Sequence, residues 1–308
     1  MTTSLYTHEA CLGHDPGGYH PESPERLRAV LEGLSTPAFA ALDRRAAPRG
    51  DLADIARVHP RNFIEALLAA VPERGHAAID ADTVLSPGSG EAALRAVGAV
   101  CAAVDAVMEG SINNAFCAVR PPGHHAEPER AMGFCLFNSV AIGALRAREV
   151  HGLERIAIID FDVHHGNGTQ AVCENDPALF YGSTHQSPLY PGTGARSETG
   201  VGNVVNVPLR PMSGSAEFRH AFNEFVLPAL EDFRPDFLLI SAGFDAHRSD
   251  PLAQLMLSEV DYAWATERLT ACAGRHCRGR VVSTLEGGYD LAALASSAAA
   301  HVAALMAA

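Results

Sequence analysis

The sequence predicts an α/β protein whose central, mostly parallel sheet is flanked by helices on both faces. Short apolar runs recur along the chain, segments with helical spacing separate them, and polar residues gather directly after the runs. Strands that are apolar throughout and alternate with helices are typical of parallel sheets covered on both sides. A chain of 308 residues fits one large α/β domain, so we expect a single domain over residues 1–308.

The expected strands and helices follow from the spacing of apolar residues. Short β-branched or apolar runs are typical of buried strands, and apolar residues at every third or fourth position are typical of helices. The expected strands are Ala115–Val119, Ile156–Asp160, Asn203–Val207, Phe237–Ser241 and Val281–Leu285. The expected helices are Glu91–Met108, Ser139–Glu149, Ala216–Phe233 and Ser258–Cys272, with a closing helix in the alanine-rich segment that begins at Leu291.

The composition is that of a globular chain with an acidic surplus. The hydrophobic share of 47% and the charged share of 19% exclude a disordered or collagen-like protein. A formal charge of −13 argues against nucleic-acid binding and favours cationic partners. The sequence has neither an apolar run of membrane-spanning length nor a signal-peptide pattern, so we expect a cytoplasmic protein that does not insert in a membrane. Seven cysteines without a CxxC pair predict reduced thiols.

Four polar loops follow the predicted strands. They read RPPGHHAEPERAMGFC after Val119, DFDVHHGNGT after Ile159, SAGFDAHRSDP after Ile240 and EGGYD after Leu285. In open parallel sheets, ligands bind beyond the carboxyl ends of the strands. Each of the four loops leaves such a strand end, so we expect them to converge on one cleft.

Two of these loops predict a metal site. Asp162 and His164 lie two residues apart at a strand end, a spacing that places both side chains on one side of an extended chain. A carboxylate oxygen and an imidazole nitrogen suit Zn²⁺, and a catalytic zinc keeps three protein ligands and one position for water. Asp245 is the best candidate for the third ligand, because it follows its strand as Asp162 follows the earlier one.

Other polar residues are candidates for proton transfer. His124 and His125 follow a Pro-Pro-Gly sequence, and because adjacent side chains diverge we expect two separate supporting or acid–base roles. Asp160 and Asn167 flank the ligand pair and are placed to orient one imidazole each. Tyr289 follows two glycines, a flexible turn that can project a phenol to stabilise an oxyanion.

These residues resemble the zinc-dependent histone deacetylase family, including its bacterial, class II-like deacetylase-like amidohydrolases. The resemblance covers most of the chain through seven ordered motifs: YHPESPERL, RPPGHH, GFCLFN, IDFDVHHGNGT, YPGTG, SAGFDA and LEGGYD. It implies an arginase/deacetylase fold and a zinc-dependent hydrolase that removes acetyl or short acyl groups from amines. The implied substrate is an acyl-lysine peptide or protein, or another acylated amine.

The resemblance also implies a role for each matching residue. Asn167 stands where some members have Asp, and Tyr190 stands where the family usually has Phe. The implied zinc ligands are Asp162, His164 and Asp245, and the implied catalytic residues are His124, His125, Tyr289, Asp160 and Asn167. The implied substrate-binding residues are Phe134 and Tyr190, as aromatic walls of a tunnel, with Gly133, Leu252 and Gly287. A monovalent cation, K⁺, is implied at Asp160, Asp162, His164 and Ser183.

The substrate has a second interpretation, an acetylpolyamine. Polyamine-selective relatives can place a Glu in a DPEG-like segment after the third zinc ligand, to attract a second ammonium group. This chain has Asp250, Pro251, Leu252 and Ala253 there. An apolar Leu252 offers no charge partner to an internal amine, so we expect a preference for acyl-lysine.

Two rival functions remain beside the deacetylase. A binuclear manganese ureohydrolase needs further carboxylates where this chain has Gly166 and His247, so its second metal lacks ligands. An acyl-lysine binding module without catalysis is disfavoured because every catalytic position holds a competent residue type, including Tyr289. The sequence leaves the natural substrate, the acyl length and the oligomeric state open.

Overall fold

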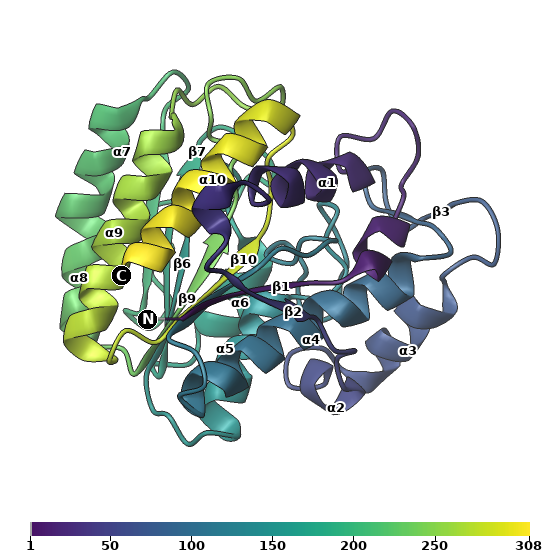
Figure 1. The fold of residues 1–308 in the computed structure, drawn as a ribbon, viewed down its shortest axis with the longest axis horizontal. Coiled ribbons are helices and arrows are strands. Elements are labelled where there is room, and N and C mark those ends of the chain that lie inside the picture. Colours follow the sequence, from purple (N-terminus) through teal and green to yellow (C-terminus); the bar gives the residue numbers. More distant parts are fainter. Residues whose placement is uncertain (1) are drawn as a thin grey trace.

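An eight-stranded parallel sheet forms the centre of the protein in this computed structural model, which describes residues 2–308 (Figure 1). The strand order is β2-β1-β5-β10-β9-β6-β7-β8, and neighbouring strands run parallel throughout. The prediction of an α/β fold on a mostly parallel sheet is confirmed. The strands are β1 (Thr3–Thr7), β2 (Asp43–Ala46), β5 (Asn114–Cys117), β6 (Ile156–Asp160), β7 (Leu179–Gln186), β8 (Val204–Leu209), β9 (Phe237–Ala242) and β10 (Val281–Leu285), and the two-residue strands β3 (Ala77–Ala78) and β4 (Val84–Leu85) pair separately.

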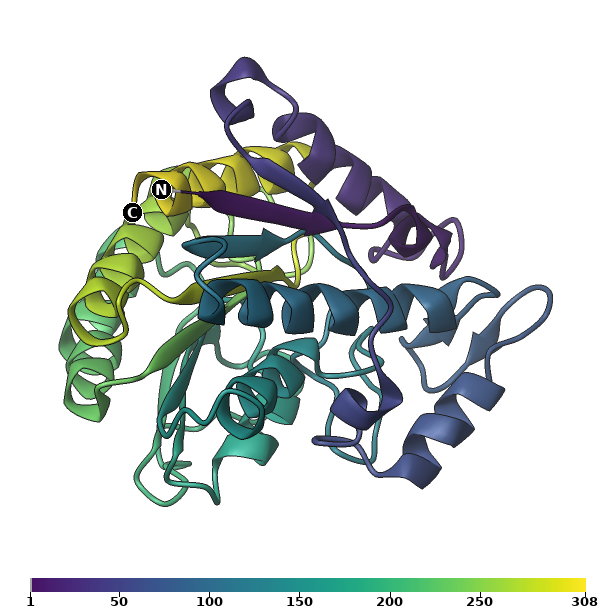
Figure 2. The same cartoon turned by 60° about the horizontal axis from the view of Figure 1, so that its bottom comes forward.

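Helices cover both faces of this sheet (Figure 2). On one face, α4 (Ser89–Met108) packs on β5 and β10, and α5 (Ser139–Glu149) packs on β6 and β9. On the other face, α10 (Leu291–Ala307) lies between α9 (Glu259–His276) and α1 (Pro24–Gly33). The remaining helices are α2 (Leu52–Ile55), α3 (Arg61–Ala69), α6 (Asn167–Cys173), α7 (Ser215–Ala221) and α8 (Leu227–Phe233), with a π-helical turn over Phe222–Val226 and 3₁₀ turns over Glu9–Gly13 and Pro37–Phe39.

The agreement between expected and observed elements depends on how regular the apolar pattern is. The expected bounds of β6, β10 and α5 equal the observed ones. The expected helix Ala216–Phe233 is interrupted by the π-helical turn, and the closing helix is present as α10. The analysis of apolar runs did not identify β1, β2 or β7. Within residues 2–308, no helix has both the length and the apolar character that a membrane crossing requires.

Four adjacent strands place the predicted functional loops side by side. β10 and β9, the last two strands in the chain, insert between β5 and β6. Cys117 pairs with Thr284, Thr284 with Ser241, and Ser241 with Asp160, so the carboxyl ends of these strands lie level. The four polar loops therefore leave the sheet at one place, as the strand-end argument predicts.

The crossing of α4 with an earlier segment requires a glycine. A Cβ atom on Gly98 would lie 2.0 Å from the Pro48 carbonyl oxygen and 2.7 Å from the Gly50 nitrogen. We expect Gly98→Ala to lower the free energy of unfolding by about 1–3 kcal/mol, because the added methyl pushes the two segments apart. Urea denaturation measures this change.

The matched control is Gly274→Ala, in α9. No atom lies within 4 Å of the methyl group that this substitution adds. Alanine favours a helix interior over glycine by about 0.5–1 kcal/mol, so the control should be at least as stable as the unmodified chain. Equal stabilities of the two variants would contradict the steric explanation.

Candidate active site

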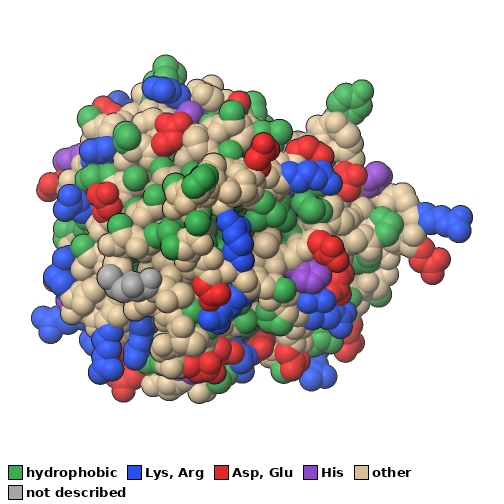
Figure 3. Space-filling view, in the orientation of Figure 1, with side chains coloured by type: hydrophobic (Ala, Val, Ile, Leu, Met, Phe, Trp, Pro, Cys, Tyr) green, Lys and Arg blue, Asp and Glu red, His purple; other side chains and the backbone are tan. Residues whose placement is uncertain are grey.

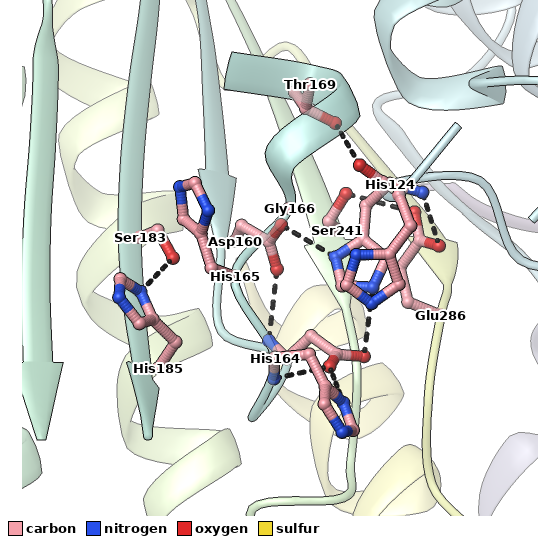
Figure 4. A network of polar contacts seen from close by, with 12 residues as sticks. His124, Asp160, His164, His165, Gly166, Thr169, Ser183, His185, Ser241 and Glu286 are labelled. Atoms are coloured by element: carbon pink, nitrogen blue, oxygen red, sulfur yellow. Dashed lines mark hydrogen bonds and ion pairs between the residues drawn. The ribbon is translucent and has the colours of Figure 1, made fainter. Parts of the chain in front are cut away.

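The three predicted metal ligands meet beyond the ends of β6 and β9. Asp162 and His164 come from the loop after β6, and Asp245 comes from the loop after β9. The His164 Nδ1 lies 3.1 Å from Asp162 Oδ1 and 3.2 Å from Asp245 Oδ2, and one ligand atom of each residue lies within 4.8 Å of the other two. Both aspartates are fully buried. Figure 4 shows His164 below Asp160, at the lower end of this polar network.

This donor set fits a zinc ion. Two carboxylate oxygens and one imidazole nitrogen are typical ligands of a catalytic zinc. Burial raises the pKa of Asp245 to about 7, with a further contribution from the charge of Asp162. Burial opposes a charge on His164, but its hydrogen bonds to Asp162 and Asp245 outweigh this and raise its pKa to about 10. Two buried carboxyl groups thus attract positive charge to one point, which a divalent cation satisfies.

The backbone closes around the carboxylates at Gly287, which has no side chain in the way. The Gly287 N–H donates to Asp162 Oδ2 at 2.8 Å. A Cβ atom at this position would lie 2.0 Å from Asp245 Oδ2 and 2.6 Å from Asp162 Oδ2. Gly287 therefore lies directly against the predicted metal ligands, and any larger residue at this position would displace them.

A cavity of about 220 Å³ leads from the surface to His164. The Phe134 ring lies edge-on to the Tyr289 ring, with centroids 5.9 Å apart, and the Tyr190 ring lies 5.2 Å from the His125 ring. The cavity contains every predicted substrate-binding residue except Gly287. Its lining residues are Asp82, His125, Gly133, Phe134, His164, Leu189, Tyr190, Leu252 and Tyr289.

His124 pairs with a carboxylate. Its Nδ1 lies 3.0 Å from Asp160 Oδ2 (Figure 4). The same oxygen accepts the Tyr181 hydroxyl at 3.0 Å. The His124 Nε2 lies 3.8 Å from Asp162 Oδ2. Burial disfavours the charged imidazole, but Asp162 and Asp160 together hold the pKa of His124 well above its usual value. His124 is therefore a buried positive charge beside the metal ligands.

His125 pairs instead with a neutral amide. Its Nδ1 lies 2.8 Å from Asn167 Oδ1, while Asn167 Nδ2 donates to Glu127 Oε1 at 2.7 Å. The bond to Glu127 orients the amide, so the His125 Nδ1 carries the hydrogen and its Nε2 keeps a free lone pair. Burial and the neighbouring His124 and His164 lower the pKa of His125 well below its usual value. His125 therefore has the character of a neutral base.

The two histidine rings lie closer together than expected for adjacent side chains. Their centroids are 4.0 Å apart, with an angle of 42° between the planes. The expectation that neighbouring side chains diverge holds for an extended strand, whereas this pair lies in a loop outside regular secondary structure. Both rings reach the same site, but their different partners give them different charge states.

Tyr289 is held by residues that the sequence argument did not include. Its N–H donates to Asp250 Oδ2 at 2.7 Å. The fully buried Arg26 donates through Nε to the Gly288 carbonyl oxygen at 2.6 Å, and its guanidinium lies 4.8 Å from the centre of the Tyr289 ring. Arg26 lies in the YHPESPERL motif, but nothing in that motif indicates a contact with the last loop.

Glu286 is a further buried carboxyl group that the sequence argument missed. Its Oε2 accepts from the Gly123 and His124 N–H groups at 2.7 and 3.2 Å, and its Oε1 accepts from the Ser241 hydroxyl at 3.0 Å. Burial raises the pKa of Glu286 to about 7. Glu286 directly follows β10, just as the other functional loops directly follow their own strands, and this position is the sequence signal that could have identified it. Glu286 holds the His124 backbone in position.

The residues of the predicted potassium site also lie together. Asp160 on β6 and Ser183 on β7 are paired neighbours in the sheet. The Ser183 hydroxyl lies 2.9 Å from the Nδ1 of His185 (Figure 4). Asp162 and His164 follow directly after Asp160, so the four predicted residues lie near the carboxyl end of β6. Potassium binding stays a prediction.

Comparisons with known proteins agree with this geometry. Residues 20–305 match the model of the histone deacetylase domain. The chain is 37% identical to a histone deacetylase-like amidohydrolase of Pseudomonas aeruginosa, over 94% of this chain and 82% of that protein. It is 40% identical to the chloroplastic histone deacetylase 14 of Arabidopsis thaliana, over 98% of this chain and 76% of that protein. The crystal structure of the HDA15 HD domain superposes with a TM-score of 0.94 at 35% identity, covering 99% of this chain and 88% of that one. This chain belongs to the histone deacetylase family, as its sequence and its fold both show.

Proposed function

We propose that the protein is a zinc-dependent amidohydrolase that removes acetyl or short acyl groups from the side-chain amide of acyl-lysine. One observation carries the proposal: His164 of the three-residue metal-binding set, the His125 imidazole with its free nitrogen and the Tyr289 phenol all border one cavity. The cavity is narrow and apolar along Phe134 and Tyr190, which suits the four-carbon stem of a lysine side chain. Family membership supports hydrolytic deacetylation as the reaction.

The residues of the cavity divide the proposed chemistry between them. Zinc held by Asp162, His164 and Asp245 would polarise the amide carbonyl and make water more acidic. The His125 Nε2 takes the proton from the attacking water and returns a proton to the departing amine, because its Nδ1 hydrogen is committed to Asn167. The Tyr289 hydroxyl donates to the oxyanion that forms on the carbonyl oxygen. The products are a free amine and a short carboxylic acid.

An acetylpolyamine amidohydrolase is the second candidate function. The apolar Leu252 at the cavity offers no partner to an internal ammonium group, which favours acyl-lysine. Asp82 lines the same cavity. Its carboxylate could pair with an internal ammonium group in place of the acidic residue that is absent at Leu252. This residue is the specific observation in favour of the polyamine alternative, so the two substrate classes need a direct comparison.

Three further properties belong to the same proposal. We infer a K⁺ ion near Asp160 and Ser183, a single catalytic domain over residues 1–308 and a cytoplasmic location. The chloroplastic name of the Arabidopsis relative belongs to that protein. Because the chain itself contains no lysine, it is not its own acyl-lysine substrate, and deacylation measured with the purified protein reports only on the added substrate.

The first prediction concerns the metal. The purified protein should carry about one zinc per chain by elemental analysis and should hydrolyse a fluorogenic acetyl-lysine amide. Asp245→Ala should lose both the zinc and the activity, because one imidazole and one carboxylate remain to hold the ion. Asp232→Ala, which removes an exposed carboxylate from α8, should keep both.

Two results would contradict this model. Two tightly bound transition metals per chain would favour a binuclear site. One zinc without any turnover would favour an acyl-lysine binding module.

The second prediction concerns the two histidines. His125→Ala should keep its zinc while kcat falls by about 100-fold or more, because positioned proton transfer contributes about 100-fold to 10,000-fold. His124→Ala should reduce kcat less, because that imidazole supplies charge beside Asp160. Steady-state kinetics on zinc-loaded variants measures both effects. Near-normal turnover by His125→Ala would refute its role as the acid–base group.

The third prediction concerns the substrate. We expect a higher kcat/KM for acyl-lysine amides than for acetylspermidine or acetylputrescine, measured at one ionic strength. Leu252→Glu should shift the ratio toward the polyamines, because it adds a charge partner for a second ammonium group. Leu252→Gln, similar in size but uncharged, is the matched control and should leave the ratio unchanged. A preference of about tenfold or more for acetylpolyamines in the unmodified protein would overturn the assignment.

A further inference from the structure

An open hollow lies beside the mouth of the cavity. It has a volume of about 510 Å³, and its walls are the loop of residues 16–21, Ala81, Asp82 and Phe134. We call it the side hollow. Asp82 and Phe134 also line the cavity that leads to His164, so one wall separates the two spaces. A substrate whose acylated side chain enters the cavity therefore has its neighbouring groups next to the side hollow.

The side hollow has a fixed frame. The His20 Nε2 lies 2.9 Å from the Asp82 carbonyl oxygen, and the His20 ring meets the Phe134 ring edge-on, with centroids 4.7 Å apart. The Phe134 N–H donates to the Thr83 hydroxyl at 3.2 Å. These contacts join three segments that are distant in sequence, so the walls of the side hollow are held by the same residues that shape the cavity.

An exposed aromatic side chain stands at the edge of this hollow. Tyr19 is fully exposed, on a loop where Gly17 adopts a positive φ of 117°. In Figure 3, a projection that ends in hydrophobic side-chain atoms stands clear of the body at the upper right, where Figure 1 draws the loop before α1. Tyrosine is enriched where proteins bind partners, because it buries a large apolar ring and keeps a polar end. The Tyr19 side chain is fully exposed among residues 2–308, so its removal should not affect folding.

Asp82 gives the hollow a negative charge. Burial raises the pKa of Asp82, and the nearby carboxylate of Asp80 raises it further. Over residues 2–308, neither Asp80 nor Asp82 forms an ion pair with an arginine. The Asp82 carboxylate accepts the Thr83 hydroxyl at 3.2 Å but has no arginine partner among these residues. A cation that enters the side hollow therefore meets a carboxylate without an ion pair beside two aromatic rings, an arrangement that suits a guanidinium group.

We propose that the side hollow binds a cationic side chain that flanks the acylated lysine of a peptide substrate, with Asp82 as its charge partner and Tyr19 and Phe134 as its aromatic walls. This inference rests on the proposed deacylase function and names its substrate class as basic peptides. An arginine next to the acyl-lysine matches the hollow in both charge and shape.

The shape of the two spaces favours a peptide over a linear polyamine. A polyamine continues along one line from the acylated nitrogen, so its next ammonium group lies along the axis of the cavity. A peptide branches at the Cα atom of the acyl-lysine, outside the cavity, and sends neighbouring side chains sideways. The side hollow lies beside the cavity mouth, where such a side chain arrives.

The test compares three acetyl-lysine peptides that differ only in the preceding residue, which is Arg, Ala or Glu. The unmodified protein should show a kcat/KM about threefold to tenfold higher for the Arg peptide than for the Ala peptide, mainly through KM, as expected for one partly exposed ion pair with an aromatic contact. The Glu peptide should be the poorest substrate. Asp82→Asn and Tyr19→Ala should each bring the Arg-to-Ala ratio close to one.

The ratio of the two kcat/KM values removes effects that a substitution has on both peptides, such as a small shift of Thr83, whose hydroxyl donates to Asp82 Oδ1 at 3.2 Å. Asp15→Asn is the matched control. Asp15 is exposed and precedes the loop, and its Oδ1 accepts the Gly17 N–H at 3.1 Å, a bond that asparagine preserves. This variant removes one negative charge close to the side hollow but outside its walls, and it should keep the Arg preference.

Binding measurements keep this inference separate from the proposed reaction. Calorimetry of the same peptides on the His125→Ala variant should give tighter binding of the Arg peptide by a similar factor, whether or not turnover occurs. Equal binding and equal turnover of the Arg and Ala peptides would overturn the inference and leave the deacylase function standing. An Arg preference in binding with no hydrolysis by the unmodified protein would support the side hollow and refute the reaction. A loss of acetylspermidine turnover in Asp82→Asn, with an unchanged Arg-to-Ala ratio, would assign Asp82 to polyamines and overturn the inference.

Discussion

Buried negative charge at the end of the sheet is the constraint on which the rest of this site depends. Asp160, Asp162, Asp245 and Glu286 are all fully buried, and they lie at or directly after the carboxyl ends of three adjacent strands, β6, β9 and β10. Carboxylates removed from water are unstable unless hydrogen bonds or positive charge compensate them. The loops supply both, through the N–H groups of Gly123 and Gly287 and through imidazole rings. A cation held by Asp162, His164 and Asp245, as proposed, would complete the same compensation.

This constraint also separates the properties of the two histidines. His124 faces Asp160 and lies close to Asp162, so carboxylates hold a proton on it. His125 faces the neutral Asn167 and lies beside two other imidazoles, so it stays a free base. Two adjacent histidines thus acquire different charge states, because one faces a carboxylate and the other faces a neutral amide. The proposed reaction uses the neutral imidazole of His125 as its base, while the charge on His124 balances the buried carboxylates.

The outer part of the cavity follows a different principle. Its walls come from loops that approach from distant parts of the chain, and their contacts are mostly aromatic and apolar. Asp82 precedes α4, whereas Phe134 follows the histidine pair and Tyr190 follows β7. These loops contribute shape and charge at the mouth without changing the buried carboxylates below. In the proposed function, residues at the inner end of the cavity would perform the reaction and residues at its mouth would select the substrate.

The sequence by itself determined the fold class and the residue types that perform the chemistry, because both are local signals. β6 begins with four consecutive apolar residues and β10 begins and ends with apolar residues, and polar motifs follow such runs directly. The search for apolar runs does not identify β7, because the second half of this buried strand contains the polar residues Ser183, Thr184 and His185. Only the tertiary structure decided which residues support the site: Arg26 bonds to Gly288 across 262 residues, Glu127 orients Asn167, and Asp82 reaches the cavity mouth. Such contacts depend on how distant loops pack together, and packing between distant segments leaves no periodic pattern along the chain.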